Sequence, residues 1–458
     1  MTLRKCVQRL ASVALGMSLL LGAMSASAQL VGEVEFARGV GFAQTPGQVP
    51  RTLGKGLGLR EGDRLTTSEG ASAIIKLDDG TRMTVRPNSE MVLQAYQFKE
   101  NAPDNNMLMQ LVRGGFRAVT GLISKNAPNA ARVQTSTATI GIRGTDFDAR
   151  LCTRECAAES SRVQESARPN AVLASAKVVT SQGEVNATDA GGTRRRLVDG
   201  GSVYPGDVVE TGRGTRAVLA FRDDTRITLG QTTRFRVDNF VYDSENAAEG
   251  RFLASILKGT VRALTGLIAK ANNRNVGFST ATATIGIRGT GLDVICEGVC
   301  AQEETAAADA GLTVFTWLGS ISVTPTGSTA LEVLQAGQGL FISRSGIRPI
   351  GSQPSIDEPR PDSVDVPAKL FSHDNVSDEQ EGLFVFVRKG HIEIVTANDI
   401  LQLGNGEAGF AGSGGQTARP NSIPKFIDFD KLPLPTSRNP LLVSVLADAG
   451  VRSSNQCK

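Results

Sequence analysis

Apolar and polar residues alternate in several short runs of this chain. In one run, Thr137 to Asp148 (TATIGIRGTDFD), small or apolar residues occupy the even positions up to Gly144. This alternation predicts a strand with one buried face. Phe147 falls on the opposite parity, which predicts a bulge or corner at Gly144. The run TATIGIRGTGLD, from Thr282 to Asp293, repeats the pattern and changes parity after Gly289.

The region before each run is duplicated as well. Gly39 corresponds to Gly183, an offset of 144 residues (183 − 39), and the copies stay in register apart from one inserted residue. Each copy contains a glycine–aspartate turn, Gly62-Asp63 or Gly206-Asp207. In such a turn glycine supplies backbone freedom, and aspartate can accept hydrogen bonds from nearby backbone N–H groups. A repeat this long indicates a duplicated domain rather than a short solenoid coil.

Composition favours a mainly β chain. Its 458 residues include 50 glycines and 18 prolines but only 5% aromatic residues, which is typical of many short strands joined by tight turns. After the duplication, alternation returns over 311–345 and again from Leu383 to Phe410, where Gly390 matches Gly319.

These patterns divide the chain into six segments. We expect a signal peptide over 1–28, a first copy over 29–165, a second copy with trailing strands over 172–345, a proline-rich linker over 346–367, a smaller C-terminal β unit over 368–415 and a proline-rich tail over 416–458. The tail contains a short apolar run, Leu441 to Leu446. This run is too short to span a membrane, and we expect it to dock on the edge of a β domain.

The N-terminus has the layout of a cleavable secretory signal. Arg4, Lys5 and Arg9 precede an apolar run, and a Ser-Ala-Ser-Ala sequence ends at Ala28. The apolar run is shorter than the roughly 20 residues of a membrane span, so cleavage after Ala28 is favoured over a retained anchor. The mature protein is therefore expected in the periplasm or otherwise outside the cytoplasm, without an integral membrane span.

Charge does not favour nucleic acid as a partner. The formal net charge is +3, and the first 28 residues hold three basic and no acidic residues, so the mature chain has a charge of 3 − 3 = 0. A nucleic-acid binder is expected to show a basic patch or stripe. The only basic cluster, Arg194 to Arg196, lies beside glycines in an expected loop.

A pair of cysteines follows each repeated run: Cys152 with Cys156, and Cys296 with Cys300. In an exported chain such pairs are expected to form disulfides. The closed loop is small, so each bridge should contribute less than the roughly 3 kcal/mol of a fifteen-residue loop and should pin a surface turn. The four cysteines could instead hold zinc, although the pairs belong to separate copies. Cys457 remains, either free or paired between molecules.

Two arginines of the repeated runs, Arg143 and Arg288, are candidates for binding a carboxylate or phosphate bidentately. An ion pair within the domain is the favoured alternative, with an acid such as Asp63, Asp146 or Asp207. The sequence Gly-Ile-Arg-Gly-Thr lacks the ending and the following helix of a phosphate-binding loop.

Other candidates for chemistry are weaker. His373 lies between Ser372 and Asp374, but a catalytic triad is assembled from residues distant in sequence, and His391 is expected to be a partly exposed strand residue. Four carboxylates at two corners are expected to be solvated turn residues rather than calcium ligands or glycosidase acids; they are Asp78, Asp79, Asp223 and Asp224. The sequence thus predicts no catalytic, cofactor-binding or metal-binding residue.

Several stretches of the first copy together resemble the FecR domain: the glycine–aspartate turn, LDDGTRMTVRPNSE, RGGFRAVTGLI and TATIGIRGTDFD. The resemblance covers roughly 30–156 and 174–300. It implies an all-β fold, with two tandem β-solenoid-like FecR-type domains plus a smaller C-terminal β unit. The family signature, for which we expect a structural role, comprises Thr139, Ile140, Gly141, Ile142, Arg143, Gly144 and Thr145, and Thr284, Ile285, Gly286, Ile287, Arg288, Gly289 and Thr290.

In regulators of the ferric-citrate type, the FecR domain faces a TonB-dependent receptor and follows a cytoplasmic anti-sigma segment and one transmembrane helix. Here only nine residues precede the apolar run, too few for a folded cytoplasmic segment. The chain is therefore similar to the stand-alone exported FecR-domain proteins of Gram-negative bacteria.

The leading hypothesis is an exported, non-enzymatic protein that binds an envelope protein as a scaffold or signalling module, through strand edges and turn faces. One alternative is a periplasmic regulator in a TonB-receptor and sigma-factor type of system. Another is a glycan- or peptidoglycan-binding module, which should show a row of exposed aromatic residues. Only Trp317 and three tyrosines are available for such a row.

Overall fold

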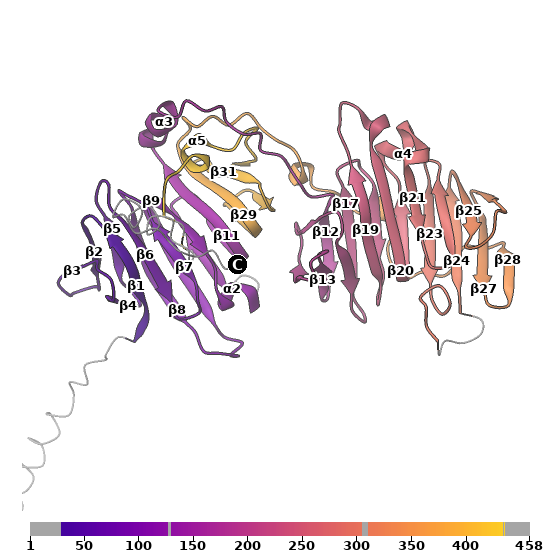
Figure 1. Ribbon diagram of the computed structural model, residues 1–458, viewed down its shortest axis with the longest axis horizontal. Helices are drawn as coiled ribbons and strands as arrows, with labels where there is room; N and C mark the ends of the chain where they lie inside the picture. Colours follow the sequence, from indigo (N-terminus) through magenta and orange to yellow (C-terminus); the bar gives the residue numbers. More distant parts are fainter. Residues whose placement is uncertain (1–28, 127–129, 305–309, 434, 436–458) are drawn as a thin grey trace, which may run out of the picture.

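The computed structural model describes residues 29–126, 130–304, 310–433 and 435. The expected signal peptide, the apolar run 441–446 and Cys457 lie outside these residues. The described chain forms one sheet of 15 strands and one of 17, with only short helices. The all-β prediction is therefore confirmed, and Figure 1 shows the two sheets as two bodies side by side.

The first domain consists of two layers of strands. Layer one contains β1 (Leu30–Arg38), β4 (Gly58–Arg60), β6 (Ser72–Leu77), β7 (Arg82–Val85), β31 (Ala408–Gly412) and β32 (Thr417–Ala418). Layer two contains β2 (Gly41–Gln44), β3 (Arg51–Thr52), β5 (Arg64–Thr67), β8 (Glu90–Gln97), β10 (Ala131–Gln134) and β30 (Ile400–Leu403). Three 14-residue strands cross between the layers: β9 (Asn106–Val119), β11 (Thr139–Cys152) and β29 (Gly382–Val395).

The second domain repeats this plan. Its layer one contains β12 (Ala176–Gln182), β15 (Ser202–Val203), β17 (Arg216–Phe221), β18 (Arg226–Leu229), β23 (Gly291–Cys296), β24 (Leu312–Leu318), β27 (Gln338–Ser343) and β28 (Gly346–Ile350). Its layer two contains β13 (Val185–Thr188), β14 (Arg194–Leu197), β16 (Val208–Thr211), β19 (Arg234–Val241), β21 (Val276–Ser279), β22 (Ala283–Ile287), β25 (Ser320–Pro325) and β26 (Glu332–Gln335). The strand β20 (Arg251–Leu264) crosses between the two layers.

The corner predicted within the signature is present in both copies. Residues 139–142 of β11 pair with β10 in layer two, whereas residues 146–151 pair with β9 in layer one. Gly144, between these halves, has a φ of +63°, and Gly289, between β22 and β23, has a φ of +73°. Glycine adopts such angles without the steric cost that a Cβ atom would add. The change of parity in the sequence therefore marks the passage from one layer to the other.

The C-terminal β unit completes the first domain. The strand β29 pairs with β11 from Thr139–Val395 to Cys152–Gly382, just as β24 and β25 pair with β23 and β22 in the second domain. In Figure 1 the strand β29 accordingly lies beside β11, and β31 lies beyond β29. The second domain is thus inserted between β11 and β29 of the first. The sequence match between Gly390 and Gly319 reflects equivalent bends, with φ of +106° and +71°.

Each domain buries its apolar core between its two layers. In the first domain Ile75 and Met83 of layer one and Leu65 and Met109 of layer two belong to one buried cluster, which also includes Ile394 of β29. The linker predicted over 346–367 begins with an edge strand, β28, and continues as an irregular segment. The finer expectation of a solenoid-like coil stays a prediction.

Short helices occur at equivalent places in the two domains. The helices α2 (Leu122–Asn126) and α4 (Leu267–Ala271) follow β9 and β20. The helix α3 (Arg154–Ser161) follows β11 and contacts α5 (Lys425–Asp428) near the end of the described chain. None of the helices in the described residues is long and apolar enough to cross a membrane.

Candidate functional site

The predicted disulfides are present. Cys152 bonds Cys156 and Cys296 bonds Cys300, with Cα–Cα distances of 5.6 and 5.2 Å. Because all four thiols are consumed, the alternative of a zinc site at these cysteines is wrong. The first bridge packs in a small cluster with Phe384 and Phe426, so it fixes the start of α3 against the C-terminal part of the chain.

The signature residues hold the corner of each domain. The hydroxyl of Thr145 donates to the His391 carbonyl at 3.1 Å, and the hydroxyl of Thr290 donates to the Ser320 carbonyl at 2.9 Å. Each bond ties the corner to a strand that pairs beside it in the same domain, β29 in the first and β25 in the second. Arg143 lies 3.5 Å from the carboxylate of Glu393.

The expected ion pair of Arg143 within its domain is present, but its acid is Glu393 rather than one of the three aspartates suggested from the sequence. Asp63 pairs with Arg51, Asp207 pairs with Arg195, and Asp146 lies 3.6 Å from Arg117. Glu393, the partner of Arg143, comes from β29, about 250 residues away, and could not be found from local sequence. Arg288 is exposed at the corner of the second domain.

The glycine–aspartate turns have the predicted geometry. Gly62 and Gly206 have φ of +84° and +89°. The carboxylate of Asp63 accepts the backbone N–H of Arg60 at 2.8 Å, and that of Asp207 accepts the backbone N–H of Tyr204 at 2.7 Å.

At the Asp-Asp corners the expectation of solvated turn residues is wrong for the first-domain Asp79 and the second-domain Asp223. Both are buried, and each carboxylate accepts the backbone N–H and the hydroxyl of the threonine two residues on. Asp223 also accepts the N–H of Ile268 in α4, at 3.4 Å. Burial raises the pKa of Asp223, while these hydrogen bonds act in the opposite direction. These carboxylates therefore hold the corner onto the following helix.

The histidines form no catalytic arrangement with their sequence neighbours. His373 Nε2 lies 2.5 Å from the carbonyl of Asn170, and Ser372 supplies only its carbonyl, to Arg419. In the described part of the chain, no group of histidine, cysteine or acidic side chains is arranged to hold a metal ion.

His391 is a partly exposed residue of β29, as expected, but both nitrogens of its imidazole are buried. This burial makes stability depend on pH. Burial, with the nearby charges of Arg143 and Lys177, lowers its pKa to about 3. Below the unfolded pKa of about 6.5 the unfolded chain binds a proton that the folded chain does not, so stability falls as pH falls towards 3. Between pH 7 and pH 5, urea denaturation should show the natural protein losing about 2 kcal/mol more than His391→Gln. Equal losses in the two proteins would contradict this assignment.

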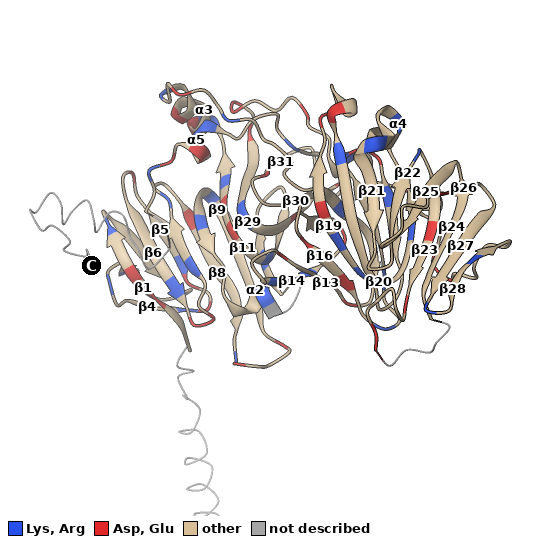
Figure 2. Cartoon of the chain, turned by 45° about the vertical axis from the view of Figure 1, so that its right-hand side comes forward, with Lys and Arg blue, Asp and Glu red and all other residues tan. Residues whose placement is uncertain are grey.

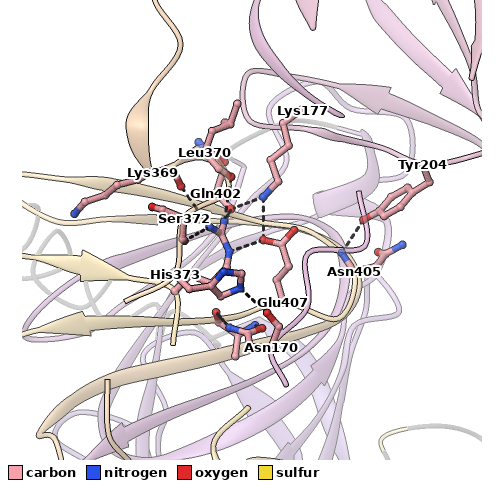
Figure 3. A network of polar contacts seen from close by, with 12 residues as sticks. Asn170, Lys177, Tyr204, Lys369, Leu370, Ser372, His373, Gln402, Asn405 and Glu407 are labelled. Carbon is pink, nitrogen blue, oxygen red and sulfur yellow. Dashed lines mark hydrogen bonds and ion pairs between the residues drawn. The ribbon is translucent and has the colours of Figure 1, made fainter. Parts of the chain in front are cut away.

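A fully buried ionic cluster lies where the two domains meet (Figure 3). The ammonium of Lys177, on β12 of the second domain, contacts the carboxylate of Glu407 at 2.9 Å and the carbonyl of Gln402 at 3.1 Å. The Nε of Arg419 donates to the same Glu407 oxygen at 2.9 Å. All three charged side chains have 0% exposure. We call Lys177, Glu407 and Arg419 the junction cluster.

The junction cluster has one buried negative charge against two positive ones. Burial alone would raise the pKa of Glu407, but the charges of Lys177 and Arg419 hold it below its usual value. Burial lowers the pKa of Lys177 to about 8, although Glu407 partly offsets this effect. Arg419 also donates to the carbonyls of Ser372 and Gln402, each at 2.9 Å. Because buried charges need such partners, the cluster fixes the end of the first domain against the start of the second.

Among the described residues, nothing buries the equivalent end of the second domain in the way that the junction cluster buries the end of the first. In the described residues, β28 pairs only with β27 and is the last strand of its sheet. Three apolar side chains are exposed at this end, Leu331 by 55%, Val333 by 43% and Ile347 by 52%. We call this surface the distal end; Figure 1 shows β25, β27 and β28 there, away from the first domain.

The FecR family model, described as "FecR protein", matches this chain twice, at residues 63–186 and 207–316. These matches cover just over half of the 458 residues. The chain belongs to the FecR family. The two matched segments begin at Asp63 and Asp207, the aspartates of the two glycine–aspartate turns, and they include both signatures. Membership places this FecR protein in a family of envelope-associated signalling regulators.

Similarity to solved structures is low. Two crystal structures of a protein from Parabacteroides distasonis, provisionally named an anti-sigma factor, match with a TM-score of 0.24 and 16% identity. The match covers 32% of this FecR protein and 59% of that protein. No curated protein matches the sequence.

Proposed function

We propose that this FecR protein is an exported, non-enzymatic signalling regulator or scaffold that binds an envelope protein through the distal end. The observation that carries the proposal is the difference between the two equivalent ends. The end of the first domain is buried against the second through the junction cluster, whereas the distal end exposes Leu331, Val333 and Ile347. Exposed apolar side chains on a domain edge are typical of protein interfaces.

The proposed contact is made by side chains rather than by an added strand. The edge strand β28 contains Pro349, which lacks a backbone donor, and Arg348 stacks on Phe341 with 4.6 Å between guanidinium and ring centre. Proline and charge on an edge strand disfavour pairing with a further strand. A partner surface with its own apolar side chains fits this end best.

Two other features support a protein partner. Figure 2 shows acidic and basic positions interleaved over both domains, which gives no extended field for a highly charged ligand. The side chain of Trp317, which the glycan hypothesis would need, lies under Arg360, with 3.8 Å between the guanidinium and the ring centre.

Membership of a regulatory family and the disulfides, which are typical of oxidising compartments, support an extracytoplasmic location.

The test compares proteins recovered from envelope extracts with three forms of the full chain. We expect Val333→Glu combined with Ile347→Glu to lose the partner that the natural protein retains, because two charges would be desolvated in an apolar contact. The matched control is Val241→Glu, at an apolar position of the same domain exposed by 57%, which should retain it. Retention of the same proteins by the distal-end variant would contradict the proposal.

A further inference from the structure

The outer face of layer one is covered in both domains by an extended segment from a distant part of the chain. The last residue of each repeated run, Asp148 or Asp293, points out of the core on this face, yet each is only 1% exposed. In the second domain the cover is residues 353–364, which we call the strap. In the first domain it is residues 429–433, directly after α5.

The two covering segments place an acid at the same site. Asp430 forms an ion pair with Arg86, which directly follows β7. Glu358 of the strap lies against Gly230, the equivalent position after β18, and accepts the backbone N–H of Gln231 at 3.3 Å. The equivalence follows from the offset of 144 between Arg86 and Gly230 (230 − 86), the same as between Gly39 and Gly183.

From this acid both segments run in the same direction, back along the neighbouring strand. The carbonyl of Pro433 accepts the hydroxyl of Thr84 on β7 at 2.8 Å. The carbonyl of Val364 accepts Arg226 of β18 at 3.1 Å. The segments are also similar in composition, since IDFDKLPLP (427–435) and IDEPRP (356–361) both combine an Ile-Asp pair, a further acid and a Pro-x-Pro sequence.

The strap is held mainly by polar and cation–π contacts. The Glu358 carbonyl accepts Arg262 Nη1 at 2.7 Å, the Gln353 side chain donates to Asp293 at 2.9 Å, and Arg360 stacks on Trp317. Most strap residues remain exposed or half-exposed. The first-domain segment, by contrast, follows directly on α5, whose Phe426 and Ile427 are buried in an apolar cluster. The strap is therefore the weaker-held of the two.

One buried group shows that the strap fills its face incompletely. The hydroxyl of Thr228 is equivalent to that of Thr84, and Thr228 is 0% exposed. None of the described residues forms a hydrogen bond with this hydroxyl, whereas Thr84 is satisfied by the Pro433 carbonyl. A buried hydroxyl without a partner is costly. The face thus offers a donor that a segment placed like residues 430–433 would satisfy.

We propose that this face of the second domain is a docking site for an extended polypeptide with a carboxylate followed within three residues by a proline, and that the strap is its internal competitor. The site comprises Arg226, Thr228, Arg262, Asp293 and Trp317. A hollow beside the strap, lined by Arg216, Val218 and Pro359, continues this surface. The site is separate from the distal end, so either proposal can fail alone.

Trp317 is the only tryptophan of the chain and reports on the strap directly. The double variant Glu358→Ala, Arg360→Ala is expected to shift its emission to longer wavelength and to increase its quenching by acrylamide. Arg360→Ala alone changes a side chain exposed by 43%. It should produce smaller changes in Trp317 emission and quenching and leave the free energy of unfolding unchanged. Unchanged emission and quenching in both variants would overturn the idea of a strap that covers Trp317.

The docking site itself is tested with a synthetic peptide of residues 427–435 added to the full-length double variant. We expect saturable binding that reverses the Trp317 shift, weaker binding of the peptide in which Asp430 is alanine, and a further Thr228→Val change to weaken binding about fivefold, as one hydrogen bond allows. Absence of saturable binding, or equal binding with Thr228→Val, would overturn the proposal.

Discussion

A chain that ends after residue 380 is expected to lose the fold of its first domain while its second domain stays folded. The missing strands β29 and β30 supply seven fully buried apolar side chains to the first core: Leu383, Val385, Val387, Ile392, Ile394, Leu401 and Leu403. At about 1.5–3 kcal/mol for each buried side chain, their loss amounts to roughly 10–20 kcal/mol. A domain is stable by only about 5–15 kcal/mol.

Limited proteolysis with mass mapping measures this outcome. Residues 29–165 should be digested rapidly, whereas a fragment containing β12 to β28 should resist. Addition of residues 381–435 as a separate chain should restore protection of the first domain. A truncated chain with both domains protected would show that the first domain does not need its C-terminal strands.

The second large effect is expected from Glu407→Gln. This change leaves Lys177 and Arg419 buried together without an opposing charge, and loss of one partner from a buried ionic group costs about 3–5 kcal/mol. Lys177→Met should lower the free energy of unfolding much less, because Glu407 and Arg419 remain as an ion pair without net charge. The Nε of Arg419 lies 2.9 Å from a Glu407 carboxylate oxygen. The asymmetry follows from the count of two cations and one anion in the junction cluster.

Urea denaturation of the natural protein, Glu407→Gln and Lys177→Met tests this prediction. Glu379→Gln, at an exposed position, serves as the control and should change stability by less than about 0.5 kcal/mol. If Lys177→Met destabilised the protein as much as Glu407→Gln, the single negative charge of Glu407 would not be what makes the junction cluster stable.

The sequence predicts those features that depend on local backbone chemistry. The parity change at Gly144 and Gly289 predicts a corner because side chains alternate along a strand, and both glycines have positive φ there. The CxxxC pairs predict short disulfides because the loops are small enough to close. These inferences require no knowledge of which strands become neighbours.

Features that depend on strand neighbours could not be predicted in the same way. Alternation shows that β29 is a strand, but its apolar face fits any open layer, so its pairing with β11 had no local signal. The match of Gly390 with Gly319 was the one available clue, since equivalent bends imply equivalent places in a domain. For the same reason Glu407 was missed as the partner of Lys177, 230 residues away.

Burial of polar groups was the other source of error. An Asp-Asp pair before Gly or Thr looks like a solvated turn, and Asp78 and Asp224 fit that description as exposed residues. Their neighbours Asp79 and Asp223 are buried because the helix after β9 or β20 folds over each corner. Hydrogen bonds to backbone N–H groups make such burial tolerable.

The central claim, that the distal end is the partner surface, is tested most directly by site-specific photo-crosslinking in intact cells. A photoreactive residue is placed at Val333 in one strain and, in another, at Val241, which lies outside the distal end and is somewhat more exposed (57% against 43%). The account predicts a discrete crosslinked protein adduct from position 333 that is absent from position 241. Identical crosslinking patterns from the two positions, or no adduct from position 333, would contradict it.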